Sequence, residues 1–73
     1  EVVNLQTYIP NPGTYEFKIV DIYGKIVWEE RFELVKGINL NTFDVQGISS
    51  GMYLVSVKNA RTREKDAMRF IRQ

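Results

Sequence analysis

The sequence contains no cysteine and no histidine. Without cysteine the chain can form neither a disulfide framework nor a thiolate metal site, and it has no thiol nucleophile. Without histidine it lacks the commonest general base near neutral pH and the commonest metal ligand. No apolar run approaches the roughly 20 residues that a membrane-spanning helix needs, and no signal-peptide pattern is present. We therefore expect no catalysis, no cofactor and no metal.

The chain is also short. Its 73 residues suffice for one domain, and a domain of about this size buries only about 60% of the surface that its unfolded chain exposes. So small a core leaves little room for a deep catalytic cleft. Because the sequence starts with Glu1 rather than Met, we expect a single domain, residues 1–73, that forms the end of a larger protein.

The side chains that could carry chemistry have ordinary explanations. Ser49 and Ser50 have no histidine to activate them, and a glycine-bounded turn accounts for both. The carboxylates of Glu29 and Glu33 fall on the polar side of a predicted strand, where a solvated face explains them. No acidic residue starts a run of oxygen ligands with the spacing of a calcium loop.

The net charge is +1, but the basic residues gather near the C-terminal end. From Lys58 onward six basic residues stand against two acidic ones, so this segment carries +4 and the rest of the chain −3. No aromatic residue lies among the charges between Lys58 and Lys65, and the two carboxylates dilute the patch, which argues against nucleic acid and against an anionic membrane surface. Charges on a terminal edge strand also block edge-to-edge aggregation, and we favour this explanation for Arg61, Arg63 and Lys65.

Turn signals recur every 8–12 residues or so, the spacing typical of an all-β sandwich or barrel. Between them apolar and polar residues alternate with a period of two, which indicates half-buried antiparallel strands. The turns are predicted at Pro10–Gly13, Asp21–Gly24, Lys36-Gly37, Ser49–Gly51 and Asn59–Arg63. The predicted inward-facing residues are Val3, Leu5, Thr7, Ile9, Tyr15, Phe17, Ile19, Ile26, Trp28, Phe32, Leu34, Tyr53, Val55 and Val57. The pattern predicts an immunoglobulin-like antiparallel β-sandwich of six to seven short strands.

Three local expectations accompany this fold. The strand Val3–Ile9 is expected to pair with Tyr15–Asp21 across the intervening turn. Glu30 falls on the apolar face of its strand, which predicts a bulge or a sheet edge there. Asparagines interrupt the Ile38–Val45 stretch, so we expect one strand with an irregular exit.

The aromatic residues allow a sugar-binding platform, since flat rings stack on pyranose faces. Tyr15, Trp28 and Tyr53 fall on predicted core faces, and large aromatics dominate the packing of small cores. Tyr8, on a polar face, and Tyr23, in a turn, are the rings expected to be exposed.

Four short segments follow one another in order along the chain. Residues 19–27 read Ile-Val-Asp-Ile-Tyr-Gly-Lys-Ile-Val, and residues 48–57 read Ile-Ser-Ser-Gly-Met-Tyr-Leu-Val-Ser-Val. Gly37-Ile38-Asn39 lies between them, and Met68–Arg72 ends the chain with basic residues among apolar ones. This order and spacing resembles the C-terminal sorting domain family of the bacterial type IX secretion system.

A further segment has two interpretations. Residues 8–12, Tyr-Ile-Pro-Asn-Pro, are similar to the Tyr-Pro-Asn-Pro opening of that family. Family members usually have a strand pair between this opening and the Asp-x-x-Gly hairpin, whereas here only Gly13–Val20 separates the two. The short separation favours a plain turn at Pro10–Gly13.

The resemblance implies a transport address that the outer-membrane translocon reads in the periplasm. In typical members a surface sortase then removes the domain and the cargo is attached to anionic lipopolysaccharide, whereas a few members keep the domain within the attachment machinery. It further implies transit through the periplasm to the cell surface, the outer membrane or the medium. The residues that correspond to translocon recognition are Arg69, Phe70, Ile71 and Arg72, and those that serve the fold are Asp21, Gly24, Lys25, Gly37, Gly51 and Tyr53.

Two other functions remain open. One is an immunoglobulin-like accessory module that binds glycan or lipopolysaccharide, which exposure of Tyr8, Tyr23 or Trp28 in a shallow groove would favour. The other is a structural spacer. An exposed apolar terminal strand would also permit a strand-exchanged dimer of the isolated domain.

Overall fold

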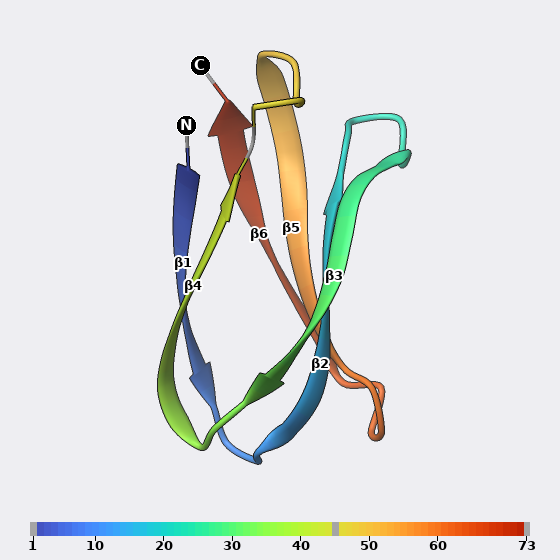
Figure 1. Ribbon diagram of the computed structural model, residues 1–73. Coiled ribbons are helices and arrows are strands. Elements are labelled where there is room, and N and C mark those ends of the chain that lie inside the picture. Colours follow the sequence, from blue (N-terminus) through green and yellow to red (C-terminus); the bar gives the residue numbers. More distant parts are fainter. Residues whose placement is uncertain (1, 45, 73) are drawn as a thin grey trace.

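The computed structural model describes residues 2–44 and 46–72, and within them it has six strands and no helix (Figure 1). The strands are β1 (Val2–Ile9), β2 (Gly13–Val20), β3 (Ile26–Leu34), β4 (Gly37–Asp44), β5 (Gly51–Asn59) and β6 (Lys65–Arg72). β1 and β4 form a two-stranded sheet, and the others form a four-stranded sheet in the order β3-β2-β5-β6. All pairs are antiparallel, and the two packed sheets confirm the predicted all-β sandwich. This described part holds no helix that could cross a bilayer.

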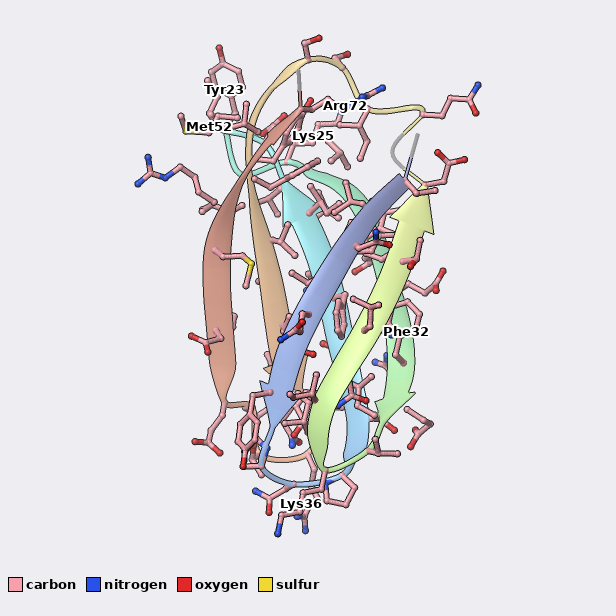
Figure 2. The ribbon with its side chains drawn as sticks, turned by 90° about the vertical axis from the view of Figure 1, so that its left-hand side faces the viewer. Tyr23, Lys25, Phe32, Lys36, Met52 and Arg72 are labelled. Carbon is pink, nitrogen blue, oxygen red and sulfur yellow. The ribbon has the colours of Figure 1, made fainter. Side chains whose placement is uncertain are left out.

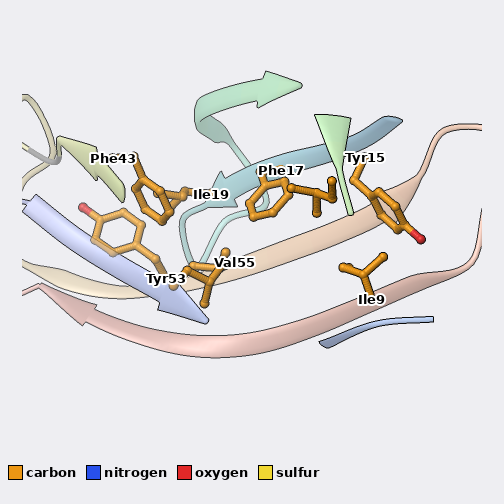
Figure 3. Packing of buried hydrophobic residues seen from close by; sticks show 9 residues of the cluster. Ile9, Tyr15, Phe17, Ile19, Phe43, Tyr53 and Val55 are labelled. Carbon is orange, nitrogen blue, oxygen red and sulfur yellow. The ribbon is translucent and has the colours of Figure 1, made fainter. Parts of the chain in front are cut away.

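The core lies between the sheets (Figure 3). On β2 the alternation places Tyr15, Phe17 and Ile19 inward, and all three are buried. Phe17 packs edge-to-face on Phe32, with ring centroids 5.0 Å apart. The other buried apolar residues are Leu5, Ile9, Leu34, Phe43, Tyr53 and Val55. The predicted inner faces of β1, β2 and β5 are therefore confirmed.

The predicted pairing of the first strand is wrong. β1 pairs with β4, with Val3 opposite Phe43 and Ile9 opposite Gly37. Both edges of β2 are occupied by β3 and β5. The Pro10–Pro12 turn instead carries the chain from one sheet to the other. The prediction failed because a period of two fixes which face of a strand is buried but not which strand pairs with it.

Two tyrosines hold two of the three crossings between the sheets. The Tyr15 hydroxyl donates to the Asn11 carbonyl at 2.7 Å, and the Tyr53 hydroxyl donates to the Ser49 carbonyl at 2.6 Å. Each tyrosine lies near the start of a strand that follows a crossing and bonds four residues back. This arrangement is similar to the tyrosine corner of immunoglobulin-like sandwiches.

One predicted inward residue, Ile26, points outward. Trp28 opposes Ile19 whereas Ile26 opposes Val20, so Val27 is an extra residue in β3. This bulge reverses the face of the strand beyond it: Trp28 stacks on Phe43 at 4.6 Å, but Ile26 is 46% exposed. The bulge is at Val27 and not at Glu30. The alternative prediction for Glu30, a sheet edge, is confirmed, because β3 is an edge strand of the four-stranded sheet.

β4 turns two of its polar residues, both half-buried, toward the other sheet. Asn39 and Asn41 face inward, while Ile38 and Leu40 are 69% and 66% exposed. The Asn39 amide explains this phase, because it donates to the Val35 carbonyl at 2.8 Å and its oxygen accepts the Val35 N–H at 3.1 Å. These bonds fix the β3–β4 crossing. The predicted strand is thus present, and its last residue, Val45, lies outside the described residues.

Candidate docking surface

The C-terminal strand β6 divides the four residues assigned to recognition between two faces. Phe70 opposes Tyr53 and points inward, where its ring centroid lies 6.0 Å from that of Tyr53. The Arg72 Nε donates to the Ile48 carbonyl at 3.2 Å and so ties the end of β6 to the segment before β5. Both side chains are half-buried. The inward pair is therefore placed to anchor the strand.

Arg69 and Ile71 lie on the opposite, outer face. Arg69 opposes Leu54, and Ile71 opposes Met52 on β5. Both are exposed, Ile71 to 59%. Within residues 2–44 and 46–72, Arg69 forms no ion pair. These two side chains are the part of the predicted set that a docking protein can contact.

The two edges of the four-stranded sheet differ in how they are protected. Each edge has a charged side chain on its inward-facing phase, Glu30 on β3 and Asp66 on β6, but β3 also has a bulge at Val27. Both inward charges and bulges hinder strand addition. β6 pairs with β5 in one unbroken register over eight residues. The β6 edge is therefore the more regular template for an added strand.

The hairpin between β2 and β3 is shaped by Asp21. Its Oδ1 accepts the N–H groups of Tyr23 and Lys25, both at 2.9 Å, and the Gly24 N–H donates to its carbonyl at 3.0 Å. Gly24 has φ +85°, a conformation that a residue with a Cβ adopts only with strain. The turn therefore presents Tyr23, 88% exposed, and the Lys25 side chain to solvent.

Gly37 and Gly51 likewise have positive φ, +103° and +148°, at the starts of β4 and β5, two of the three strands that follow crossings. Tyr53, two residues after Gly51, is buried. The residues assigned to the fold thus lie in turns or in the core, and their equivalence to the family motif stays a prediction.

A cleft opens on the side of the sandwich where β1 and β6 face each other without pairing. Its volume is about 520 Å³, and it is lined by the end of β1 and by inward residues of β5 and β6, among them Val55, Val57 and Met68. The buried Thr7 Oγ1 in this lining has no hydrogen-bond partner among the described residues. Tyr8, 71% exposed, also lines the cleft.

The basic C-terminal segment does not form one surface. Lys58 and Lys65 oppose each other on the outer face, and Arg69 lies further along that face. Asp66 and Arg72 are on the side of β6 that faces inward. Lys58 also lies 3.8 Å from Glu16. This dispersal gives no continuous track for a nucleic-acid backbone.

Glu16 is the centre of the charge cluster on the outer face. Partial burial opposes its ionisation, but the charges of Arg31 and Lys58 and the hydrogen bond from Arg31, at 2.6 Å, outweigh it and hold its pKa below the usual value of 4.5. A carboxyl whose pKa is lower in the folded than in the unfolded state stabilises the fold above its unfolded pKa. That stabilisation is lost as the pH falls through the folded pKa.

The Glu16→Gln variant should therefore be less stable than the parent at neutral pH, and the difference should vanish in acid. We expect the midpoints of urea unfolding, followed by Trp28 fluorescence, to differ at about pH 6 and to converge once the pH lies below the lowered folded-state pKa of Glu16. The Glu33→Gln variant, on the same face of β3 as Arg31, serves as a control for the loss of one negative charge. A constant difference across this range would contradict the lowered pKa.

The described residues hold no group of three or more histidine, cysteine, aspartate or glutamate side chains that could bind a metal. Their one buried polar residue is Asn59, whose Oδ1 accepts the N–H groups of Arg61 and Thr62. That side chain is fully explained by the β5–β6 turn.

One feature of the outer face does not follow from the alternation of the strands. At one end of the four-stranded sheet the outward residues are apolar, and two exposed apolar residues of the adjoining β2–β3 turn, Ile22 and Tyr23, extend them. We call this set the apolar patch: Val20, Ile22, Tyr23, Ile26, Met52, Leu54 and Ile71. The signal was present in the sequence, because Ile19-Val20, Met52–Val55 and Phe70-Ile71 are unbroken apolar runs where a half-buried strand would alternate.

Comparison with known proteins gives one match. The chain matches, over residues 1–71, the family model described as the secretion system C-terminal sorting domain. No curated protein and no solved structure matches it.

Proposed function

Because the chain belongs to the family of secretion system C-terminal sorting domains, we propose that the type IX translocon at the outer membrane reads strand β6 of this domain as an export address. The family is one of sorting signals and not of enzymes, and membership implies contact with the type IX machinery. It also implies delivery to the cell surface, the outer membrane or the medium. The proposal adds where on the domain the address lies.

The observation that carries this proposal is the regular edge of β6, which pairs with β5 on one side and with no described strand on the other. Alternate backbone groups of an edge strand point away from its partner and can pair with a strand of a receptor. The same strand turns Arg69 and Ile71 to the outer face, where they can add specificity. Phe70 and Arg72 contribute by holding the strand in place.

An export assay tests the proposal. The domain is fused behind a periplasm-targeted fluorescent reporter in a type IX-competent bacterium, with and without residues Arg69–Gln73. We expect surface delivery of the intact fusion and a loss of at least tenfold on deletion, since a loss of about 1.4 kcal/mol in receptor binding is tenfold in affinity. A Glu30→Ala fusion, altered on the β3 edge, should be delivered normally. Normal delivery of the truncated fusion would exclude β6 as the address.

The same assay separates two fates of the domain. If a surface sortase removes it, the delivered reporter loses the mass of the domain and carries lipopolysaccharide. If the domain is retained in a surface component, the delivered fusion keeps its full mass. Mass spectrometry of the surface fraction distinguishes the two.

A glycan-binding accessory module is a second candidate, favoured by the exposed Tyr8 ring. Tyr8 lies in a cleft that is also lined by Asn11, Glu64 and Asp66, whose side chains can bond sugar hydroxyls. Trp28 is not available for stacking on a sugar, because it packs on Phe43. Calorimetric titration with lipopolysaccharide oligosaccharide should give binding that Tyr8→Ala abolishes if this candidate is right.

A further inference from the structure

The outer face of the four-stranded sheet is divided into a polar and an apolar half. In the polar half Lys18 opposes Glu29 and Ser56, and Glu16 bonds Arg31. One pair of residues further along β2, Val20 opposes Ile26 on one side and Leu54 on the other. The change from charged to apolar residues thus occurs within a single step of the strand, which defines a sharp border for the apolar patch.

The apolar patch is continuous across the four strands. Leu54, 47% exposed, lies between Val20 on β2 and Arg69 on β6, and Met52, 46% exposed, opposes Ile71. The β2–β3 turn extends the patch, with Tyr23 at the same end of the molecule as Met52 (Figure 2). Contiguous exposed apolar surface of this kind marks interaction sites in soluble proteins.

Cations outnumber carboxylates around the patch. Arg69 continues the row of Val20 and Leu54, and the Lys25 side chain is exposed at the end of the molecule that carries Tyr23 (Figure 2). The nearest carboxylate in the turn, that of Asp21, already accepts two backbone N–H groups through one oxygen. A partner that covers the patch is therefore complementary if its own apolar surface is edged by carboxylates.

The charges also argue against a second copy as the occupant. In a two-fold dimer the same patch meets itself, so two rims that both carry exposed cations, Arg69 and Lys25, would be brought together. A bilayer is a poorer fit than a protein, because most of the patch lies flat in a sheet face. Flat apolar sheet faces pack against another layer of protein about 10 Å away.

We propose that the export machinery recognises the folded domain through this apolar patch, by means of a protein surface that is apolar and edged with carboxylates. The inference rests on the proposed function and extends the address from β6 to β5, β2 and the Asp21–Lys25 turn. The patch unites residues from Val20 to Ile71, which come together only in the sandwich. An unfolded tail with the same last strand would not present it.

The test compares two leucines that are exposed on opposite faces. Leu54→Asp alters the apolar patch, whereas Leu40→Asp alters the outer face of the β1–β4 sheet, where Leu40 is 66% exposed. In the reporter export assay we expect Leu54→Asp to lower surface delivery at least tenfold and Leu40→Asp to change it less than twofold. The milder pair Leu54→Thr and Leu40→Thr keeps the strand propensity of each position, and we expect a loss of about threefold for Leu54→Thr alone. Circular dichroism of each purified variant reports whether it is folded.

Each outcome has a distinct meaning. Normal delivery of both Leu54 variants, with a delivered parent fusion, would overturn this inference and leave the proposed function in place. Failure of the parent fusion itself would overturn both. Binding of the parent domain to vesicles with 30% phosphatidylglycerol, lost in Leu54→Thr, would show a lipid occupant and overturn the protein partner. An equal loss of delivery in the Leu40 pair would show a general effect of exposed leucines and overturn the assignment to this face.

Discussion

Replacement of Phe17 by alanine is expected to remove a large share of the stability of the domain. Phe17 is fully buried in the middle of β2, between β3 and β5, and packs edge-to-face on Phe32. Such a truncation removes apolar contacts and leaves a cavity, at a cost of about 3–5 kcal/mol. A chain of 73 residues has a total stability of about 4–11 kcal/mol at the usual value per residue. At the middle of both ranges, the loss is thus about half of the total stability.

Urea denaturation followed by Trp28 fluorescence measures this effect, since the indole stacks on Phe43 across the core. Tyr23→Ala is the matched control, because its ring is 88% exposed and its loss should change the free energy of unfolding by less than about 0.5 kcal/mol. If Phe17→Ala unfolded at the same urea concentration as the parent, the core would not lie where the structure places it.

The faces of the central strands could be predicted from the sequence, but the neighbours of β1 could not. On β2 and β5 one alternating set of side chains is buried by the opposite sheet, so core residues such as Phe17 and Val55 can be predicted from the alternation alone. Pairing of strands depends on where the crossing turns send the chain, and Pro10–Pro12 fits a hairpin as well as a crossing. Only the three-dimensional structure reveals that β1 and β4 belong together.

Local deviations from regular pleating account for the other differences. The bulge at Val27 turns Ile26 to the outer face, and the residues around it include no type that would predict a bulge. The inward asparagines of β4 follow from the bonds of Asn39 to Val35, which compete with burial of Ile38 and Leu40. Alternation assumes that burial alone sets the phase of a strand, and here side-chain hydrogen bonds set it instead.

The residues of the candidate site could be predicted from the sequence, but their arrangement in space could not. The residues of β6 could be assigned to recognition as a set, but the set mixes an anchoring face with an exposed one. Only the pairing register of β6 with β5 shows which residues lie on which face. The apolar patch depends on three pairing registers, those of β2 with β3, β2 with β5 and β5 with β6, so its members appear in the sequence only as separate apolar runs.

The division of β6 predicts that stability and export respond to different residues. Phe70→Ala should lower the free energy of unfolding by about 2–3 kcal/mol, less than for a fully buried phenylalanine, because the ring is half-buried against Tyr53. The double variant Arg69→Thr and Ile71→Thr should change it by less than about 1 kcal/mol, since both side chains are exposed and threonine suits a strand.

Export should show the reverse order. Phe70→Ala retains part of the total stability of about 4–11 kcal/mol, so most molecules stay folded and still present Arg69 and Ile71; we expect surface delivery within about threefold of the parent, in proportion to the folded fraction. The double variant stays folded but has lost both outward contacts, and delivery should fall at least tenfold. Urea denaturation and the reporter export assay on the same three proteins measure both effects. If delivery followed stability across the set, β6 would act only by holding the sandwich together, and the outward side chains would not be what the machinery reads.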